Sequence, residues 1–148
     1  MLCGLRSLLA YKLLIISLAG LIAAILSIVD ASEEGSVCDI NSYISCTRVV
    51  FSGYSSFMGV GLSVWAIIYF TMVTCMSIAY MIIGSEELLK ILWGISIAAI
   101  PIVAVLIYIE ILIIRSICIY CTAMHISIAA LAYISTVHML RSGILRRS

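Results

Sequence analysis

The apolar run that decides the fold lies at residues 13–29 and reads LLIISLAGLIAAILSIV. A membrane-spanning helix needs about 20 predominantly apolar residues, and this run, with the residues from about 8 onward, meets that requirement with only Lys12 charged. A secretory signal peptide has a shorter apolar region, of about 7–15 residues, and a small-residue cleavage site close behind it. The run therefore predicts a retained transmembrane helix at about residues 8–29.

Three further runs of the same kind lie at about residues 60–83, 88–109 and 116–140. None shows the alternation of apolar and polar residues that is typical of a membrane β-barrel. Apolar residues make up 65% of the 148 residues and charged residues 10%, whereas a soluble domain has about 45–50% and about 25%. The composition excludes a soluble enzyme, a disordered chain and a nucleic-acid-binding protein. It predicts an all-α integral membrane protein, a single four-helix bundle over residues 1–148.

Basic residues predict the orientation, because they are enriched on the cytoplasmic side of membrane proteins. With four spans, Arg48 and Arg115 fall on one side of the membrane, and the other Lys and Arg residues fall on the opposite side. The latter are Arg6, Lys12, Lys90, Arg141, Arg146 and Arg147. We therefore predict a multi-pass protein of the cell membrane with both termini in the cytoplasm. The loop at about residues 30–59 and a short turn at 110–115 then face outward.

Four cysteines gather on this predicted outer face. Cys38 and Cys46 lie in the long loop, and Cys118 and Cys121 lie where the fourth helix begins. Disulfides form and persist on the outer side of a cell membrane, whereas cytoplasmic thiols stay reduced. A long loop in a compact fold is usually functional or disordered. The placement of the cysteines favours a functional loop.

Cys118 and Cys121 form a C-x-x-C motif at a helix N-terminus. Residues three apart on a helix have Cβ atoms about 5–6 Å apart, so a small adjustment allows a disulfide between them. The free N–H groups of the helix start also stabilise a thiolate. The motif therefore predicts a redox-active pair. Two alternatives are packing cysteines in an apolar helix and a zinc site shared with Cys38 and Cys46, although their spacing is unlike a zinc knuckle.

The sequence permits more than one disulfide pairing for Cys38 and Cys46. If the segment between them were helical, they would stand about 12 Å apart, which is too far for a disulfide. A direct disulfide requires the chain to double back, and the alternative is that Cys46 pairs with Cys118. A single structural disulfide that only pins the loop is a further interpretation. A redox role would let the loop carry oxidising equivalents by thiol–disulfide exchange.

These cysteines and their surroundings resemble a known family. The loop segment CDINSYISC at residues 38–46, followed by Ser52, looks like the loop signature of the vitamin K epoxide reductase family. Cys118-Ile119-Tyr120-Cys121 at the outer end of the last predicted helix looks like the C-x-x-C of that family. The resemblance covers nearly the whole chain, including four helices, the long first loop and the spacing of both cysteine pairs.

The resemblance implies a four-helix bundle around a quinone of the ubiquinone or menaquinone type. It implies that Cys38 and Cys46 are a shuttle pair and that Cys118 and Cys121 are the active-site pair. Cys121 would face the quinone, and Cys118 would exchange with Cys46. Ser52 matches a family serine associated with the loop and the site. No metal is implied.

Departures from the family pattern indicate which activity to expect. Vertebrate members have a substrate-binding asparagine near the start of the second span, whereas this chain has a single Asn, Asn41, in the loop. Four residues after the C-x-x-C they have a tyrosine, and this chain has His125. Many prokaryotic relatives carry a fused thioredoxin-like domain, and this chain ends soon after the fourth span. We therefore expect a disulfide-forming quinone reductase that uses a separate thioredoxin-like or DsbA-like thiol protein.

His125 is also a candidate on physical grounds alone. It lies four residues after Cys121 and seven after Cys118, so the three side chains share one face of a helix. An imidazole is costly in lipid and is expected to face the bundle interior. There it could bond a quinone carbonyl or supply a proton. The alternative is a histidine bonded to a neighbouring backbone or hydroxyl group.

Two other functions compete with this one. The runner-up enzyme is a vitamin K epoxide or quinone reductase. The non-enzyme alternative is a small four-helix transport or metal-handling protein. Coupled transporters normally carry an ionisable residue within the membrane, and the middle of the first three predicted spans contains no acid. The sequence therefore favours a quinone-dependent thiol–disulfide oxidoreductase.

Overall fold

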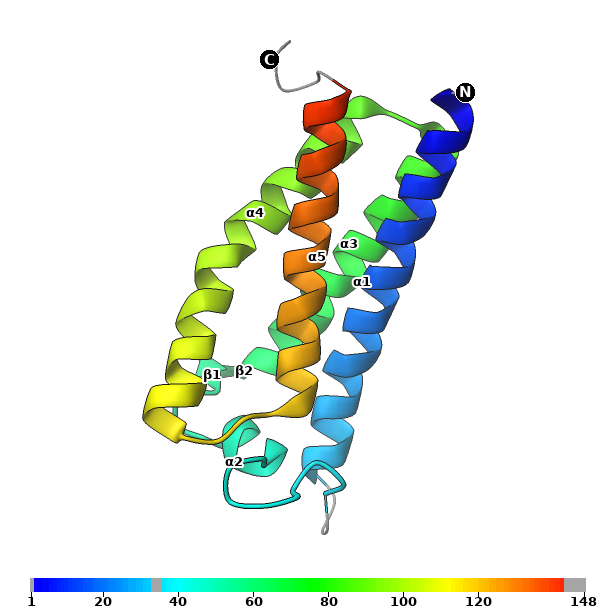
Figure 1. Ribbon diagram of the computed structural model, residues 1–148. Helices are drawn as coiled ribbons and strands as arrows, with labels where there is room; N and C mark the ends of the chain where they lie inside the picture. The colour runs from blue at the N-terminus through cyan, green and yellow to red at the C-terminus, as the bar shows by residue number, and fades with distance from the viewer. Residues whose placement is uncertain (1, 33–35, 143–148) are drawn as a thin grey trace.

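Four long helices form the protein, which is seen here as a computed structural model (Figure 1). The structure describes residues 2–32 and 36–142, with side chains from residue 7 onward. The long helices are α1 (Leu2–Ser32), α3 (Leu62–Ile83), α4 (Glu86–Tyr108) and α5 (Ile119–Arg141). All four are long and apolar enough to cross a membrane, which confirms the predicted four-helix membrane fold. The predicted orientation rests partly on Arg6, Arg146 and Arg147, whose side chains lie outside the described part of the structure.

The helices pack as a bundle in which α1 contacts α3 and α5, and α4 contacts α5 and, to a smaller extent, α3. A buried core that includes Leu13, Phe70, Leu92 and Leu131 lies between them. A Cβ atom on Gly20 of α1 would fall on the Phe70 ring, so a glycine allows the close approach of α1 to α3. Small residues at such contacts are typical of helices that pack in a membrane.

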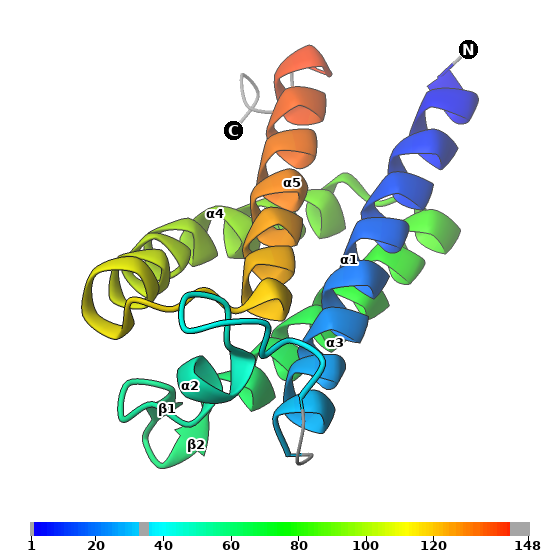
Figure 2. The ribbon, with the colours of Figure 1, turned by 60° about the horizontal axis from the view of Figure 1, so that its bottom comes forward.

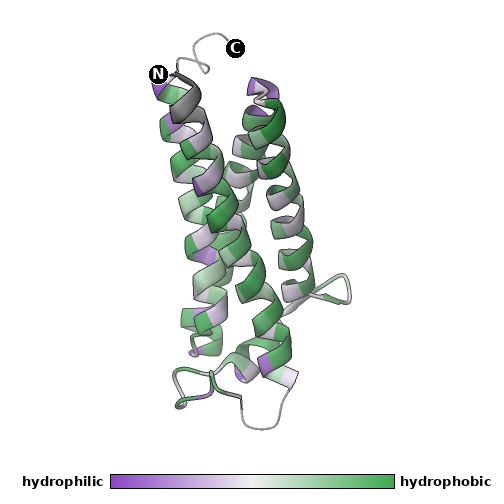
Figure 3. Ribbon diagram, turned by 90° about the vertical axis from the view of Figure 1, so that its right-hand side faces the viewer, coloured by the Kyte–Doolittle hydropathy of each residue, from purple (hydrophilic) through white to green (hydrophobic). Residues whose placement is uncertain are grey.

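Polar side chains inside the bundle bond to one another between helices. Thr74 Oγ1 donates to Ser17 Oγ at 3.0 Å, and Trp93 Nε1 donates to Thr136 Oγ1 at 2.9 Å. Apolar residues predominate along the helices (Figure 3), and many large apolar side chains, such as Ile22, Ile82 and Ile126, are exposed on the outside of the bundle. In a lipid surrounding, apolar side chains are favourable on the outside, and buried polar groups have to find partners within the bundle.

A short cap covers one end of the bundle, opposite the beginning of α1 and the end of α5 (Figures 1 and 2). It contains α2 (Cys46–Val50) and a hairpin of β1 (Ser56–Phe57) and β2 (Val60–Gly61). Met58 and Gly59 both have positive φ angles, as a two-residue hairpin turn requires. The cap corresponds to the predicted long loop, although the last predicted residues of that loop and the first of the second span form the hairpin.

The predicted turn at residues 110–115 is wrong. Residues Ile109–Ile114 form a π-helix, η1, that continues α4, and the chain reverses only at Arg115, which has a φ of 56°. The fourth helix correspondingly begins at Ile119 rather than at residue 116. The sequence suggested a turn because Glu110 and Arg115 interrupt the apolar run. In the structure the Glu110 side chain is buried rather than facing water.

Candidate active site

The loop between Cys38 and Cys46 doubles back on itself. Asn41 makes the turn, because its side-chain oxygen accepts hydrogen bonds from the backbone N–H groups of Tyr43 and Ile44, both at 2.9 Å. The backbone N–H of Ile40 also donates to the Ile44 carbonyl at 3.1 Å. The turn brings the Cα atoms of Cys38 and Cys46 to 5.5 Å, and the two cysteines form a disulfide. The sequence permits a disulfide between Cys38 and Cys46 or between Cys46 and Cys118, and the structure contains the first of these.

Backbone hydrogen bonds fasten this loop to the segment that leads into α5. Ile117 N–H donates to the Tyr43 carbonyl at 2.7 Å, and Ser45 N–H donates to the Ile117 carbonyl at 3.2 Å. These bonds form a parallel bridge between Ile44 and Ile117. As a result, Cys46 and Cys118, each one or two residues beyond the bridge, lie beside each other.

Two aspartates hold the arms of the loop. The Asp30 carboxylate accepts hydrogen bonds from Ser36 Oγ at 2.6 Å, Val37 N–H at 3.0 Å and Cys38 N–H at 3.2 Å. The Asp39 carboxylate accepts from Thr47 N–H at 3.2 Å. Hydrogen bonding from Thr47 holds the pKa of Asp39 below its ordinary value. Asp30 therefore fixes the arm that carries Cys38, and Asp39 fixes the start of α2, where Cys46 lies.

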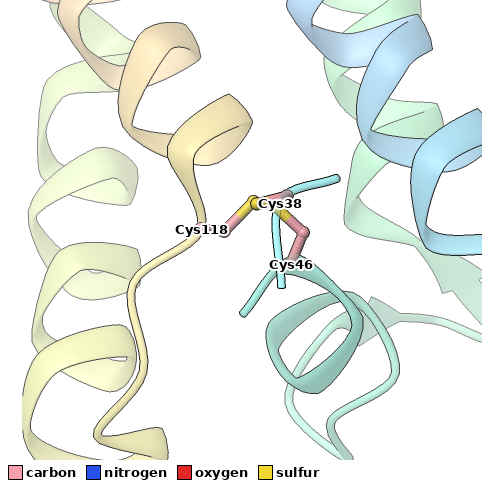
Figure 4. A group of neighbouring side chains, drawn as sticks. All are labelled: Cys38, Cys46 and Cys118. Atoms are coloured by element: carbon pink, nitrogen blue, oxygen red, sulfur yellow. A yellow bond between two sulfur atoms is a disulfide. The ribbon is translucent and has the colours of Figure 1, made fainter. Parts of the chain in front are cut away.

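Cys118 is the N-cap residue of α5, and its sulfur accepts a hydrogen bond from Cys121 N–H at 3.2 Å. Its Sγ atom lies 3.1 Å from Cys46 Sγ (Figure 4). Hydrogen bonding from the Cys121 side chain lowers the pKa of the Cys118 thiol, against the opposing effect of burial. A thiolate attacks a disulfide sulfur directly, so Cys118 is placed to open the Cys38–Cys46 bond at Cys46.

The sulfur atoms of Cys38, Cys46 and Cys118 lie within 4.8 Å of one another. Three sulfurs in this arrangement could hold a metal ion if all were thiolates. In the structure, however, two of them share a disulfide, and a disulfide sulfur carries no thiolate charge. The arrangement therefore fits thiol–disulfide exchange better than the zinc site that the sequence left open.

Cys121 faces a different space from Cys118. It lines a cavity of about 240 Å³ between the cap, α3, α4 with η1, and α5. Ser52 and His125 line the same cavity, so three of the residues singled out from the sequence meet there. Its other lining residues are mostly apolar and include Leu62, Trp65, Ala66, Ile102, Val103, Leu106, Met124 and Ile128. The C-x-x-C motif thus links a disulfide on one side to an apolar cavity on the other.

The sequence also matches the model of a known family. The model of the Vitamin K epoxide reductase family matches residues 11–136, which is most of the chain. The chain belongs to the vitamin K epoxide reductase family. No curated protein sequence matches it significantly. Members of this family are membrane oxidoreductases linked to quinones or vitamin K, so the protein is a membrane redox enzyme.

In this vitamin K epoxide reductase family member, Ser52 and His125 differ in their contacts. Ser52 Oγ donates to the Val49 carbonyl at 2.9 Å, so its hydrogen is used within the cap and only its oxygen is left to accept. The His125 ring makes no hydrogen bond to another described residue, which is contrary to the alternative of a histidine bonded to its neighbours. Both nitrogens of His125 are therefore left for an occupant of the cavity or for water.

Two further lining residues escaped the sequence analysis. Glu110 is 5% exposed, and its carboxylate accepts a hydrogen bond from Cys118 N–H. The Tyr69 hydroxyl is buried without a hydrogen-bond partner among the described residues. Its polar neighbour Ser96 lies outside hydrogen-bonding geometry and donates to the Leu92 carbonyl at 2.8 Å. Glu110 could have been identified from the sequence, because it is an acid in an apolar segment just before the C-x-x-C. No feature of the sequence distinguishes Tyr69.

Proposed function

We propose that this protein is a quinone-dependent thiol oxidase that generates disulfides. Electrons would pass from a separate thioredoxin-like or DsbA-like dithiol protein to Cys38 and Cys46, then to Cys118 and Cys121, and finally to a membrane quinone. One observation carries the proposal. The Cys118 sulfur lies 3.1 Å from the Cys46 sulfur, while Cys121 of the same motif lines the apolar cavity.

The exchange steps balance as follows. The donor is oxidised to its disulfide as the Cys38–Cys46 bond is reduced to two thiols. The Cys46 thiolate then attacks a Cys118–Cys121 disulfide at Cys118, which forms a Cys46–Cys118 bond and releases Cys121. Cys38 attacks Cys46, which restores Cys38–Cys46 and releases Cys118. The structure, with Cys38 and Cys46 joined and Cys118 and Cys121 free, corresponds to the state after this step.

A quinone fits the cavity chemically. Ligand pockets are usually apolar with a few polar groups that orient the ligand. Here the apolar lining suits a ring, and the unpartnered Tyr69 hydroxyl is a donor for a ring carbonyl. A buried polar group without a partner is costly, and a carbonyl-bearing occupant would satisfy it. Tyr69 would then supply a substrate contact in a chain that lacks the vertebrate asparagine.

Tyr69→Phe tests this fit, because it should weaken quinone binding without lowering the stability of the protein. Losing the donor should raise the KM for a soluble quinone by up to about tenfold, the equivalent of one hydrogen bond of about 1.4 kcal/mol. Removing an unsatisfied buried hydroxyl should leave the thermal stability of the quinone-free protein unchanged or higher. Steady-state kinetics and thermal unfolding measure the two effects.

Ser96→Ala serves as the matched control, since the Ser96 hydroxyl is already bonded to a backbone carbonyl. We expect it to leave the KM for quinone unchanged. A Tyr69→Phe protein that unfolds at a lower temperature and binds quinone normally would contradict this role for Tyr69.

The donor would meet the protein at the cap. Both sulfurs of the Cys38–Cys46 disulfide are buried, whereas Val37, Ile40 and Tyr43 around them are exposed. These apolar side chains suit a thiol protein with an apolar rim around its reactive cysteine. Since the disulfide is covered, the loop has to shift before a donor thiolate can attack it. The encounter should be brief, because a shuttle that bound its donor tightly would not turn over.

The proposed orientation places this cap outside the cell and both termini in the cytoplasm. Ser42 and Ser142 are both exposed. Ser42 belongs to the cap, whereas Ser142 directly follows α5, whose last residues lie at the end of the bundle opposite the cap (Figure 1). In intact cells, a membrane-impermeant thiol reagent should label Ser42→Cys, and it should label Ser142→Cys only after lysis. Labelling of Ser142→Cys before lysis would reverse the topology and contradict an outward-facing redox site.

The reduction of vitamin K epoxide is the second candidate, because it is the reaction for which the family is named. The absence of the asparagine and the presence of His125 instead of tyrosine favour quinone as the substrate. Epoxide and quinone are best compared with the same reductant and the same purified protein. Similar rates for both would make the chain an epoxide reductase.

A further inference from the structure

Glu110 is an acid buried near the outer end of α4 and η1, within a segment that spans the membrane. The π-helix that contains it is a rare conformation that is frequent at functional sites. Among the described residues there is one ion pair, between Lys90 and Glu87. Glu110 therefore has no described cation as a partner. An ionisable group buried in this way is costly and therefore points to a function.

The contacts of Glu110 connect both halves of the redox site. Its carboxylate accepts the hydrogen bond from Cys118 N–H, at the residue whose sulfur faces Cys46. It also lines the cavity together with Cys121 and His125. Among the described residues it is the single carboxylate on the cavity wall. A proton on Glu110 would therefore be next to the active-site pair and to the cavity at once.

Electrostatic repulsion restricts which of the two neighbouring groups, Cys118 and Glu110, is ionised. The Cys118 sulfur accepts the Cys121 N–H, an arrangement that favours a thiolate at Cys118. A Cys118 thiolate and a Glu110 carboxylate would be two like charges close together in a low-dielectric surrounding, and such pairs do not ionise together. When Cys118 is a thiolate, a proton on Glu110 removes the repulsion.

We propose that Glu110 holds the proton that Cys118 gives up and donates it to an oxygen of the quinone. This inference rests on the proposed function. In the reduced site, one proton is on Cys121 and one is on Glu110. As the S–S bond between Cys118 and Cys121 forms, two electrons pass to the quinone, and both protons end on its oxygens to give the quinol. Glu110 is left as a carboxylate and regains a proton when the next pair of thiols arrives.

Two substitutions separate this role from a purely structural one. Glu110→Gln keeps an oxygen that accepts the Cys118 N–H but cannot carry the proton. It should slow quinol formation in a single turnover by about 100-fold, as expected for the loss of a general acid. It should leave the exchange between a reduced donor and the Cys38–Cys46 disulfide unchanged, as measured by thiol trapping and mass mapping. Glu87→Gln is the matched control and should behave as wild type.

Glu110→Ala removes both the acceptor and the proton carrier and leaves space. Formate added to this variant should restore quinol formation by about tenfold or more, because a small acid can take the place of the carboxyl group. A structural role alone predicts no rescue.

Each outcome bears on the inference. Slow quinol formation in Glu110→Gln together with formate rescue of Glu110→Ala supports it. A Glu110→Gln protein that reduces quinone at the wild-type rate overturns it, even if Glu110→Ala is inactive, since Glu110 would then only position Cys118. If the wild-type protein itself formed no quinol, the proposed function would fail rather than the role of Glu110.

Discussion

Replacement of Cys121 by alanine is expected to abolish quinone reduction, with a loss of at least about 1,000-fold, as is usual when a reacting group is removed. Cys121 is the cysteine of the C-x-x-C that lines the cavity, whereas Cys118 faces the Cys38–Cys46 disulfide. Without Cys121, electrons that reach Cys118 have no second sulfur with which to form a disulfide. Turnover is measured with a soluble quinone and a reduced thioredoxin-like protein.

The same variant should also reveal the exchange intermediate. The Cys118 thiolate, 3.1 Å from Cys46, can open the Cys38–Cys46 bond, and in Cys121→Ala no thiol on α5 resolves the product. Mass mapping after acid quenching should therefore detect a Cys46–Cys118 disulfide and a free Cys38. Cys75→Ala is the control, since Cys75 lies on the exposed side of α3 and should turn over normally. Full turnover in Cys121→Ala would contradict the assignment.

Replacement of Cys118 by alanine should stop turnover to a similar extent but at an earlier step. A reduced donor should still open the Cys38–Cys46 disulfide, because neither cysteine of the loop is changed. Cys38 and Cys46 then remain as thiols, since the sulfur that faces Cys46 is missing. We expect about one donor disulfide per protein molecule and no quinol, measured by thiol counting and quinone absorbance.

Continued oxidation of donor by Cys118→Ala, with quinol formed in step, would mean that Cys46 passes electrons to Cys121 directly. The relay through Cys118 would then be wrong, although the quinone assignment would stand. Cys118→Ala and Cys121→Ala thus differ in a measurable way, because only the second can hold the mixed disulfide.

The membrane fold and the grouping of the four cysteines at one end of the bundle were predictable from sequence for simple physical reasons. An uncharged run such as residues 13–29 is costly in water and has one favourable place, inside a membrane. The cysteines were recognisable because two pairs fall on one predicted side, where disulfides persist. The turn at Asn41 also had a local basis, since an asparagine side chain can bond the backbone two residues on.

Glu110 was misplaced because sequence reasoning assigns charges to the membrane surface. Its burial depends on a contact with Cys118 N–H, eight residues away across a chain reversal, and on a π-helix that continues α4. Neither feature has a periodicity that a sequence reveals. Tyr69 was missed for a related reason, because a tyrosine within an apolar span is usually a packing residue. Only the three-dimensional arrangement shows that its hydroxyl has no hydrogen-bond partner among the residues that the structure describes.

We propose that electrons from two donor thiols pass through Cys38, Cys46, Cys118 and Cys121 to a quinone. The most direct test is to measure donor disulfide and quinol together, with purified wild-type protein, a reduced thioredoxin-like protein and a soluble quinone. The relay predicts that the two products appear at the same rate and in equal amounts, since each disulfide releases two electrons and each quinol takes two. Donor oxidation without quinol, or no catalysed oxidation of donor when quinone is present, would contradict it.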